Sequence, residues 1–261
     1  MKPKKSLGQN FLNNEKILNF ITEIGNINEN DIILEIGPGT GKLTKKLIEK
    51  KPLRLIAVEK DRNLSKILEN KFGKKIEIIN RDILNCFNEF KFTKPVKVFG
   101  NLPYNISTKI LTSFIKQDDL FKKYHSLSFV FQKEVAERIV AEVNTKDYGR
   151  LSILSSWKMN KSKILDISPK CFYPIPKVWS SLVVFQPKKE LIYEIKSKNL
   201  EHVTTIFFNQ RRKMIKKPMK QLFENYEDIA KNLKIDLNLR PQNLSVNKYL
   251  EICKLYERLT Q

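Results

Sequence analysis

The chain has 261 residues, of which 41% are hydrophobic and 10% aromatic, so it can bury a sizeable core, which argues against wholesale disorder. Its 49 Lys and Arg residues exceed its 28 Asp and Glu residues by 21, which favours a polyanionic partner, nucleic acid before an anionic membrane surface. Three separated cysteines and two histidines argue against a disulfide scaffold and a zinc site, so we expect no metal. No stretch approaches the ~20 apolar residues of a membrane span, so we expect a cytoplasmic protein with no membrane partner.

Helices and strands alternate in the first part of the chain. The predicted elements are strands at 31–36, 54–58, 76–79 and 96–99, helices at 13–23, 42–50 and 64–71, and further strands at 126–132 and 181–186. Strands that are separated by helical segments indicate parallel crossover connections. The sequence therefore predicts an α/β, doubly wound sheet.

The pattern changes after Gln186, where only helical periodicity remains. The predicted helices are 200–208, 219–226 and 246–259. We therefore predict two domains, residues 1–187 and a small all-helical domain at 188–261.

Basic residues are concentrated at the start of that second domain. From residue 188 to residue 220, ten Lys and Arg residues face only Glu190, Glu194 and Glu201. A run of charge is usually a solvated helical face, but the acids that would balance such a face are missing here. We therefore expect Arg211, Arg212, Lys213, Lys216 and Lys217 to contact the phosphate backbone of a nucleic acid, with an affinity that falls steeply with salt.

A glycine-rich turn follows the first predicted strand. Gly37, Gly39 and Gly41 let the backbone turn sharply and let a ligand approach closely, and the helix that follows offers free N–H groups. The spacing G-x-G-x-G matches neither the G-x-G-x-x-G fingerprint nor a P-loop. By itself this turn is weak evidence of a site, because ordinary tight turns also use glycine.

Acidic residues end the next two predicted strands. Glu59, 22 residues after Gly37, is placed to accept hydrogen bonds from both hydroxyls of a ribose, and Asp82 to meet an adenine amino group. Each could be a solvated loop acid or a helix cap, but together with the glycines they predict a nucleoside site in one crevice. Glu35, before the first glycine, would repel a pyrophosphate. It therefore favours a cationic ligand, S-adenosylmethionine, over NAD.

The tetrapeptide Asn101-Leu-Pro-Tyr104 follows the fourth strand and so reaches the same crevice. Acceptors from the Asn101 side chain and the Leu102 carbonyl, placed on the two hydrogens of an adenine amine, would favour a pyramidal nitrogen with its lone pair aimed at a methyl group. Pro103 restrains Leu102 to an extended conformation, and Tyr104 offers a flat face for a purine. A proline turn with a buried tyrosine is the alternative, but the position beside the acids favours function.

Several segments resemble the KsgA/RsmA family of rRNA adenine N6,N6-dimethyltransferases. They are Lys5–Leu12, Leu34–Thr44, Gly100–Ser107, Gln132–Arg138, Tyr148–Ser152 and Phe172–Val178. The resemblance implies a Rossmann-like class I methyltransferase domain with a helical C-terminal domain, and S-adenosyl-L-methionine as cofactor. It implies dimethylation of two adjacent adenosines near the 3′ end of 16S rRNA, within the 30S subunit or its precursor, as a step of ribosome biogenesis. We expect a monomer.

The resemblance also implies roles for single residues. The family's cofactor contacts fall on Asn10, Leu12, Gly37, Glu59, Asp82 and Asn101, to which we add Gly39 and Gly41 from the turn. The target-base contacts fall on Asn101, Leu102 and Tyr104, with Phe172 on the other face of the purine. Two residues depart from the family pattern: Trp179 stands where relatives commonly have Asp, and Pro218 interrupts the basic segment, where we expect a helix break.

Two alternative functions stay open. One is an Erm-type adenine methyltransferase that acts on 23S rRNA; the segments at Gln132 and Tyr148 and the tail argue against it. The other is a non-catalytic RNA-binding or assembly factor, or a mitochondrial-type transcription factor, on the same fold. The presence of Glu59, Asp82 and the Asn-Leu-Pro-Tyr turn argues against lost catalysis.

Overall fold

The protein was analysed as a computed structural model that describes residues 3–4 and 8–260; Lys5, Ser6 and Leu7 of the first family segment lie outside the described residues. It divides into two compact units, one of residues 1–136 and 161–187, the other of residues 137–160 and 188–261. One edge of this division falls between residues 187 and 188, and residues 137–160 lie in the second unit. The predicted division into two continuous domains, residues 1–187 and 188–261, stays a prediction.

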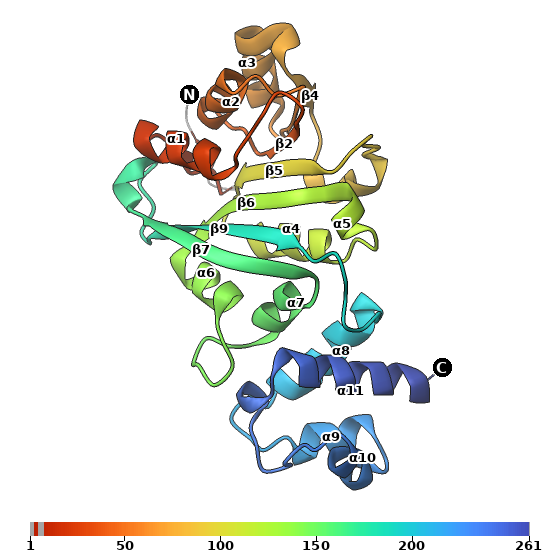
Figure 1. Ribbon diagram of the computed structural model, residues 1–261. Helices are drawn as coiled ribbons and strands as arrows, with labels where there is room; N and C mark the ends of the chain where they lie inside the picture. The colour runs from red at the N-terminus through yellow and green to blue at the C-terminus, as the bar shows by residue number, and fades with distance from the viewer. Residues whose placement is uncertain (1–2, 5–7, 261) are drawn as a thin grey trace. The chain divides into compact units, whose positions relative to one another are not determined.

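A seven-stranded sheet is the centre of the first unit, in the order β4-β3-β2-β5-β6-β9-β7 (Figure 1). The strands are β2 (Ile32–Ile36), β3 (Arg54–Val58), β4 (Glu77–Ile79), β5 (Val96–Asn101), β6 (Tyr124–Gln132), β7 (Met159–Ile167) and β9 (Ser180–Pro187). The strands from β4 to β6 in this order pair in parallel, and β9 pairs antiparallel to β6. The predicted α/β, Rossmann-like fold is confirmed, with an antiparallel addition at one edge.

The helices of the first unit connect these strands. They are α1 (Glu15–Ile24), α2 (Lys42–Glu49), α3 (Arg62–Phe72), α4 (Ser107–Ile115) and α5 (Leu120–Lys123). All five residues of β2 are buried, as expected for an apolar strand that is covered on both faces of a parallel sheet. The side chain of Asn14 caps α1 by accepting a hydrogen bond from the Ile17 N–H.

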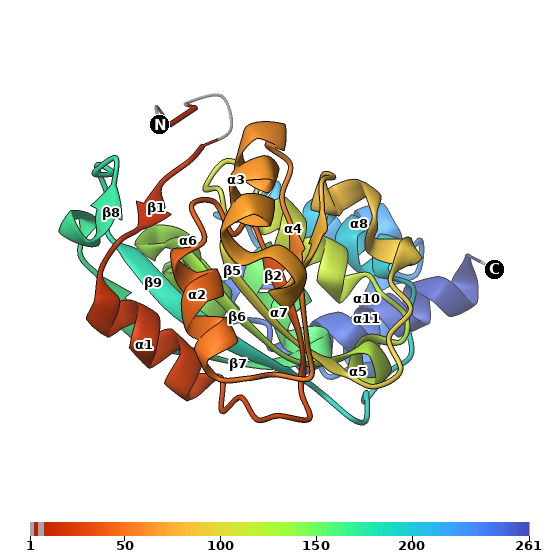
Figure 2. The same ribbon diagram turned by 90° about the horizontal axis from the view of Figure 1, so that it is seen from above.

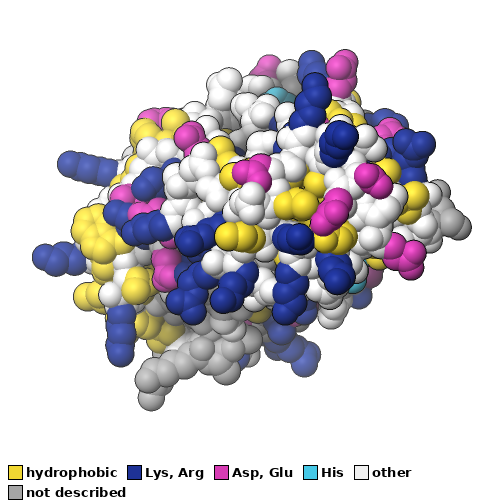
Figure 3. All heavy atoms as spheres, turned by 90° about the horizontal axis from the view of Figure 1, so that it is seen from below, with side chains coloured by type: hydrophobic (Ala, Val, Ile, Leu, Met, Phe, Trp, Pro, Cys, Tyr) yellow, Lys and Arg dark blue, Asp and Glu magenta, His cyan; other side chains and the backbone are white. Residues whose placement is uncertain are grey.

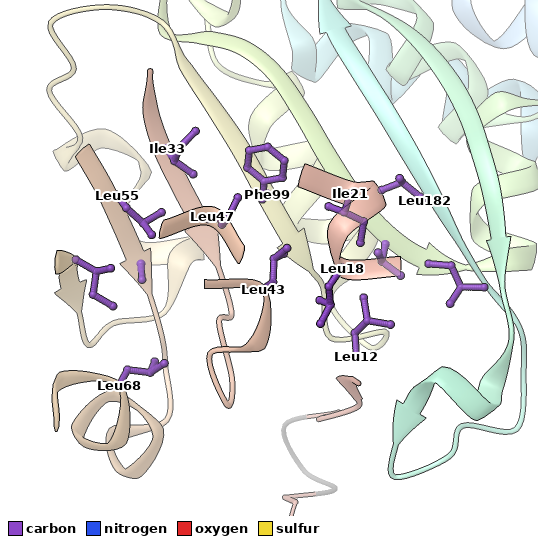
Figure 4. Packing of buried hydrophobic residues seen from close by; sticks show 14 of the residues in the cluster. Leu12, Leu18, Ile21, Ile33, Leu43, Leu47, Leu55, Leu68, Phe99 and Leu182 are labelled. Atoms are coloured by element: carbon purple, nitrogen blue, oxygen red, sulfur yellow. The ribbon is translucent and has the colours of Figure 1, made fainter. Parts of the chain in front are cut away.

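One apolar cluster joins this sheet to its helices (Figure 4). Leu18 of α1 and Leu47 of α2 pack with Ile33 of β2 and Phe99 of β5 in this cluster. Phe172 belongs to the same cluster. The side chains that close the core thus come from segments that are far apart in the sequence.

Three strands, β1, β7 and β8, escaped the sequence pattern. β1 (Phe11–Leu12) pairs antiparallel with β8 (Phe172–Tyr173), and Figure 2 shows the two side by side. Two-residue strands are too short to carry a periodicity. β7 was also missed, because its exposure does not alternate along the strand.

The second unit is helical. Its helices are α7 (Arg150–Lys158), α8 (Ser197–Phe208), α9 (Lys216–Leu222), α10 (Tyr226–Asn232) and α11 (Val246–Leu259), and α6 (Lys133–Val140) includes residues of both units. α7, α8 and α11 contact one another, and the Tyr249 hydroxyl donates to the Pro241 carbonyl at 2.7 Å. In the part of the chain that the structure describes, no helix has the length and apolarity that a membrane span needs.

The helix predicted at 219–226 is wrong in its bounds, because α9 ends at Leu222 and α10 begins at Tyr226. The break expected at Pro218 is also misplaced. The helical structure is interrupted between Phe208 and Lys216, and Pro218 lies in the first turn of α9, where its missing N–H leaves no helical hydrogen bond unmade.

Candidate active site

A pocket lies at the carboxyl ends of the parallel strands, where their following turns converge. It contains about 840 Å³ of atom-free space, open solvent at its mouth included. The sequence-predicted residues that line it are Asn10, Gly37, Gly39, Glu59, Asp82, Asn101 and Leu102. Ligands of open α/β sheets bind at this edge. The structure thus brings together the residues from the glycine turn, the two acidic strand ends and the turn after β5.

The three glycines of the turn differ in what surrounds them, although all have positive φ, at 64°, 59° and 75°. A Cβ on Gly37 would meet nothing within 4 Å, so the backbone there faces open space. A Cβ on Gly39 would lie 2.7 Å from the ring of Phe11, and one on Gly41 would meet Leu68 and Phe72 of α3. Gly41 therefore has a packing reason to be glycine, and its cofactor contact stays a prediction.

Glu59 is held in place by backbone donors. Its carboxylate accepts the N–H of Gly39 at 3.1 Å and the N–H of Asp61 at 2.8 Å, and the residue is 6% exposed. Burial raises the pKa of Glu59, and these N–H groups oppose the shift. A carboxylate offers about four lone-pair positions, so Glu59 retains acceptor capacity for hydroxyl groups of a ligand.

Asp82 is both a cap and a pocket residue. One carboxylate oxygen accepts the Leu84 N–H at 3.0 Å, which starts a short 3-10 turn, and the other pairs with the Lys60 ammonium at 3.0 Å. Burial acts to raise the pKa of Asp82, but Lys60 and the Leu84 N–H outweigh it and lower the pKa. Asp82 is therefore an acceptor at neutral pH.

The Asn101 side chain is fixed by its own amide. Its Nδ2 donates to the backbone carbonyl of Asn10 at 2.6 Å, which orients Oδ1 as an acceptor. Within residues 3–4 and 8–260, no donor bonds to that Oδ1 or to the Leu102 carbonyl. Both residues line the pocket, so two acceptors without protein donors come from consecutive residues at its wall.

The residues expected to stack on a base lie elsewhere. The Tyr104 hydroxyl hydrogen-bonds the Ser180 hydroxyl at 2.5 Å, and the residue follows the Asn-Leu-Pro turn without lining the pocket itself. Phe172 is only 3% exposed and packs in the core cluster, opposite Leu12 in the β1–β8 pair. Stacking of Tyr104 and Phe172 on a purine stays a prediction.

A smaller cavity shares Gly37 and Asn101 with the pocket, and Leu12 and Glu35 also line it. Glu35 is 1% exposed, and its Oε2 has no hydrogen-bond partner among the described residues. Burial raises the pKa of Glu35 to about 8; the charge of Glu59 adds to the shift and the Thr44 hydroxyl opposes it. A buried carboxyl group with one oxygen that lacks a hydrogen-bond partner among the described residues fits a ligand that brings a positive charge.

Lys4 and Gln9 contact the turn after β3, a contact that the sequence did not predict. Asp61, two residues after Glu59, is buried and accepts from Gln9 Nε2 at 3.3 Å and from the Lys4 ammonium at 2.8 Å. Phe11 also lines the pocket. The signal available in the sequence was Asp61 itself, a further acidic residue that follows β3 two positions after Glu59.

A concave basic surface lies in the second unit, here named the basic groove. It is lined by Gln210, Arg212, Lys213, Met214, Lys216, Lys217, Lys220, Asn238 and Arg240. On the face that Figure 3 shows, many Lys and Arg side chains are exposed, with Asp, Glu and hydrophobic side chains between them. Four of the five predicted RNA-binding residues thus line one surface, together with Lys220 and Arg240, which the prediction omitted.

Arg211 has a different environment. Its guanidinium donates to the backbone carbonyl of Lys146, and it does not line the basic groove. Arg211 therefore holds the loop before α7 to the end of α8, and its contact with RNA stays a prediction.

Comparison with known proteins gives one family. The model of the family described as ribosomal RNA adenine dimethylase matches residues 1–258. The "Ribosomal RNA small subunit methyltransferase A" of Pelagibacter ubique is 51% identical over 99% of this chain and 98% of its own. That of Ehrlichia chaffeensis is 42% identical over 96% of this chain and 95% of its own.

Solved structures share the fold. A dimethyladenosine transferase from Plasmodium falciparum superposes with a TM-score of 0.79 at 24% identity, over 95% of this chain and 98% of its own. The 23S rRNA methyltransferase ErmE superposes with a TM-score of 0.70 at 22% identity, over 96% of this chain and 100% of its own. At these identities the two structures support the fold alone.

Proposed function

Since the chain belongs to the ribosomal RNA adenine dimethylase family, we propose that it transfers methyl groups from S-adenosylmethionine to the N6 amines of two adjacent adenosines near the 3′ end of 16S rRNA. The observation that carries this proposal is the Asn101-Leu102 turn, which presents two acceptors beside a pocket that contains Glu59 and Asp82. The relatives at 51% and 42% identity, both named for the small subunit, favour this substrate over 23S rRNA.

The pocket fits the cofactor that methyltransferases of this family use. Glu59 would accept from the ribose hydroxyls and Asp82 from the adenine amine. Glu35, which lines the smaller cavity that shares Gly37 and Asn101 with the pocket, would face the methionine ammonium. Gly37 supports this fit, because any side chain there would project into the open space. When bound, S-adenosylmethionine supplies an electrophilic methyl group on a sulfonium.

The chain's own residues would act on the nucleophile. The Asn101 Oδ1 and the Leu102 carbonyl would each accept one N6 hydrogen of adenine, which withdraws the nitrogen lone pair from the ring and aims it at the methyl group. The Asn10 carbonyl keeps Asn101 in that orientation through a bond of 2.6 Å. No strong base is needed, because the amine becomes acidic only when methylated and its proton can then leave to water. Catalysis arises from orientation and from polar groups that are fixed beforehand.

Binding of the cofactor should release a proton from Glu35. With its pKa raised to about 8, Glu35 is mainly protonated at pH 7 in the free protein, and a neighbouring ammonium would favour the ionised form. The affinity for S-adenosylmethionine should therefore rise between pH 6 and pH 7, with a net release that approaches one proton. Calorimetry in buffers of different ionisation enthalpy measures this release, and Glu35→Gln should abolish it. An equal release in Glu35→Gln would assign the proton to another group.

The basic groove would contact the RNA backbone. Replacing Lys213, Lys217 and Lys220 together by alanine should weaken RNA binding and flatten the slope of log K against log salt by roughly 2 to 3, because each lost phosphate contact removes about 0.7 to 0.9. Loss of three exposed charges elsewhere, at Lys66, Lys74 and Lys75, is the matched control. Equal slopes in the two triple variants would show that net charge alone, and not the groove, determines RNA affinity.

Methylation assays separate the proposed function from its alternatives. Immature 30S particles should be methylated on two adjacent adenosines, and naked 23S rRNA should not; the reverse would identify an Erm-type enzyme. Failure to bind S-adenosylmethionine in calorimetry would favour the non-catalytic factor. Mass spectrometry of rRNA from cells that lack this protein should show both adenosines unmethylated.

The cellular setting is part of the same proposal. We expect a monomer that acts in the cytoplasm on the 30S subunit or its precursor. A target adenosine must leave its stack to reach the pocket, at a cost of a few kcal/mol that is smallest where the RNA is single-stranded. An immature particle with an exposed loop would lower that cost.

A further inference from the structure

The loop between β8 and β9 exposes large apolar side chains. Tyr173 is 58% exposed, Ile175 67%, Val178 42% and Trp179 50%, all within seven consecutive residues. Contiguous exposed apolar groups mark interaction surfaces more often than single ones do. This loop, Tyr173–Trp179, is named the aromatic loop below.

Both ends of the aromatic loop contact segments that flank the candidate active site. Trp179 directly precedes Ser180, whose hydroxyl bonds the Tyr104 hydroxyl at 2.5 Å. At the other end, Tyr173 pairs with Phe11, which lines the pocket. The backbone of Trp179 is itself fixed, because its carbonyl accepts the Lys133 N–H at 2.8 Å. The exposed indole thus lies on a backbone that is held next to the Asn-Leu-Pro-Tyr turn.

The charge around the aromatic loop selects the kind of partner. From residue 167 to residue 187 the chain contains Lys170 and Lys177 but no Asp or Glu. The preceding acid, Asp166, is paired with the ammonium groups of Lys133 at 2.7 Å and Lys163 at 3.2 Å. A segment with aromatic side chains and lysines but no acidic residue suits a nucleic acid strand, because bases can stack on the aromatic rings and phosphates can pair with the lysines.

We propose that Trp179 stacks on the base next to the adenosine that occupies the active site. The proposal rests on the proposed function, because the substrate has two adjacent adenosines and only one can occupy the pocket at a time. When that base leaves the RNA stack, its neighbour loses a stacking partner, and the exposed indole of the aromatic loop would replace it. Trp179 is therefore a positioning residue that contacts the substrate RNA.

The two tryptophans of the chain allow a direct test. Trp157 is 3% exposed, so a base that stacks on Trp179 should quench the exposed fluorophore. A short single-stranded RNA with two adjacent adenosines should quench the fluorescence of the intact protein. Trp179→Phe should lose the quenching but keep most of the RNA affinity, since phenylalanine still stacks.

Direct binding of the same RNA gives the second readout. Trp179→Ala should lower RNA affinity by about 5- to 100-fold, as the loss of one stacked base does, with cofactor affinity unchanged. Leu53→Ala is the matched control, because Leu53 is 62% exposed and immediately precedes β3, at the amino end of that strand. The control should bind RNA like the intact protein.

Two results would overturn the proposal: RNA affinity of Trp179→Ala within twofold of the intact protein, or quenching that persists in Trp179→Phe. Neither measurement requires methylation. An intact protein that shows the quenching but methylates no rRNA would contradict the proposed function and leave the stacking role supported. Normal methylation without quenching would do the opposite.

Discussion

We expect Asn101→Ala to lower kcat by about 100- to 1,000-fold, the usual effect of removing one polar group that is oriented in advance toward the reacting atoms. The expected loss is large because the side chain would accept from the target amine and is already held by the Asn10 carbonyl at 2.6 Å. Affinity for RNA should change little, since the proposed phosphate contacts lie in the basic groove. Single-turnover methylation of immature 30S particles measures the rate, and filter binding measures the RNA affinity.

Asn101→Asp separates the two contributions. Aspartate keeps an acceptor oxygen for the amine but loses the N–H that donates to Asn10 and faces that carbonyl with a negative charge. Its rate should therefore fall between those of the intact protein and Asn101→Ala. Turnover of Asn101→Ala within a few-fold of the intact protein would remove Asn101 from the mechanism.

We expect the second large effect from Glu59→Ala, which should weaken cofactor binding. Two hydrogen bonds from ribose hydroxyls to a carboxylate contribute about 1.5 kcal/mol each at the lower end of the usual range, so the Kd for S-adenosylmethionine should rise by roughly 100-fold. The substitution also leaves the N–H groups of Gly39 and Asp61 without their acceptor. We therefore expect a lower Tm as well. Calorimetry with S-adenosylmethionine checks the Kd.

Glu59→Gln distinguishes folding from binding. Glutamine keeps the size of the side chain and one acceptor oxygen, so it should preserve the Tm better than alanine and still weaken cofactor binding. RNA affinity should be unchanged in both variants. If Glu59→Gln and Glu59→Ala both bind S-adenosylmethionine like the intact protein, Glu59 has only a structural role.

One topological rule allowed the sequence to predict that the candidate catalytic and cofactor-binding residues lie close together. The carboxyl ends of parallel strands meet at one edge of a sheet, so Glu59, Asp82 and Asn101 could be placed together from the strand ends alone. Gly37 and Gly39 followed from their place after the first strand. Phe172 could not be placed in this way, because it lies beyond the parallel strands and pairs with a segment that precedes them.

The basic groove shows the opposite case. The run from Arg211 to Lys217 was visible as charge, yet Arg211 turns to the Lys146 carbonyl, and Arg240, from a separate segment, lines the groove instead. Local sequence gives charge density but not the direction in which each long side chain points. That direction depends on which backbone carbonyls and acids the fold brings near.

The amino-acid sequence by itself determined the alternation of elements, the α/β class, the crevice at the strand ends and the residue types that suit adenine methylation, because these depend on periodicity, chain order and side-chain chemistry. Only the tertiary structure decided that Glu35 is buried with a pKa near 8, that Asn10 orients Asn101, and that Trp179 is exposed beside Tyr104's partner Ser180. Burial, pKa and side-chain orientation arise from contacts between segments that are distant along the chain, and no local pattern encodes which of those segments will meet.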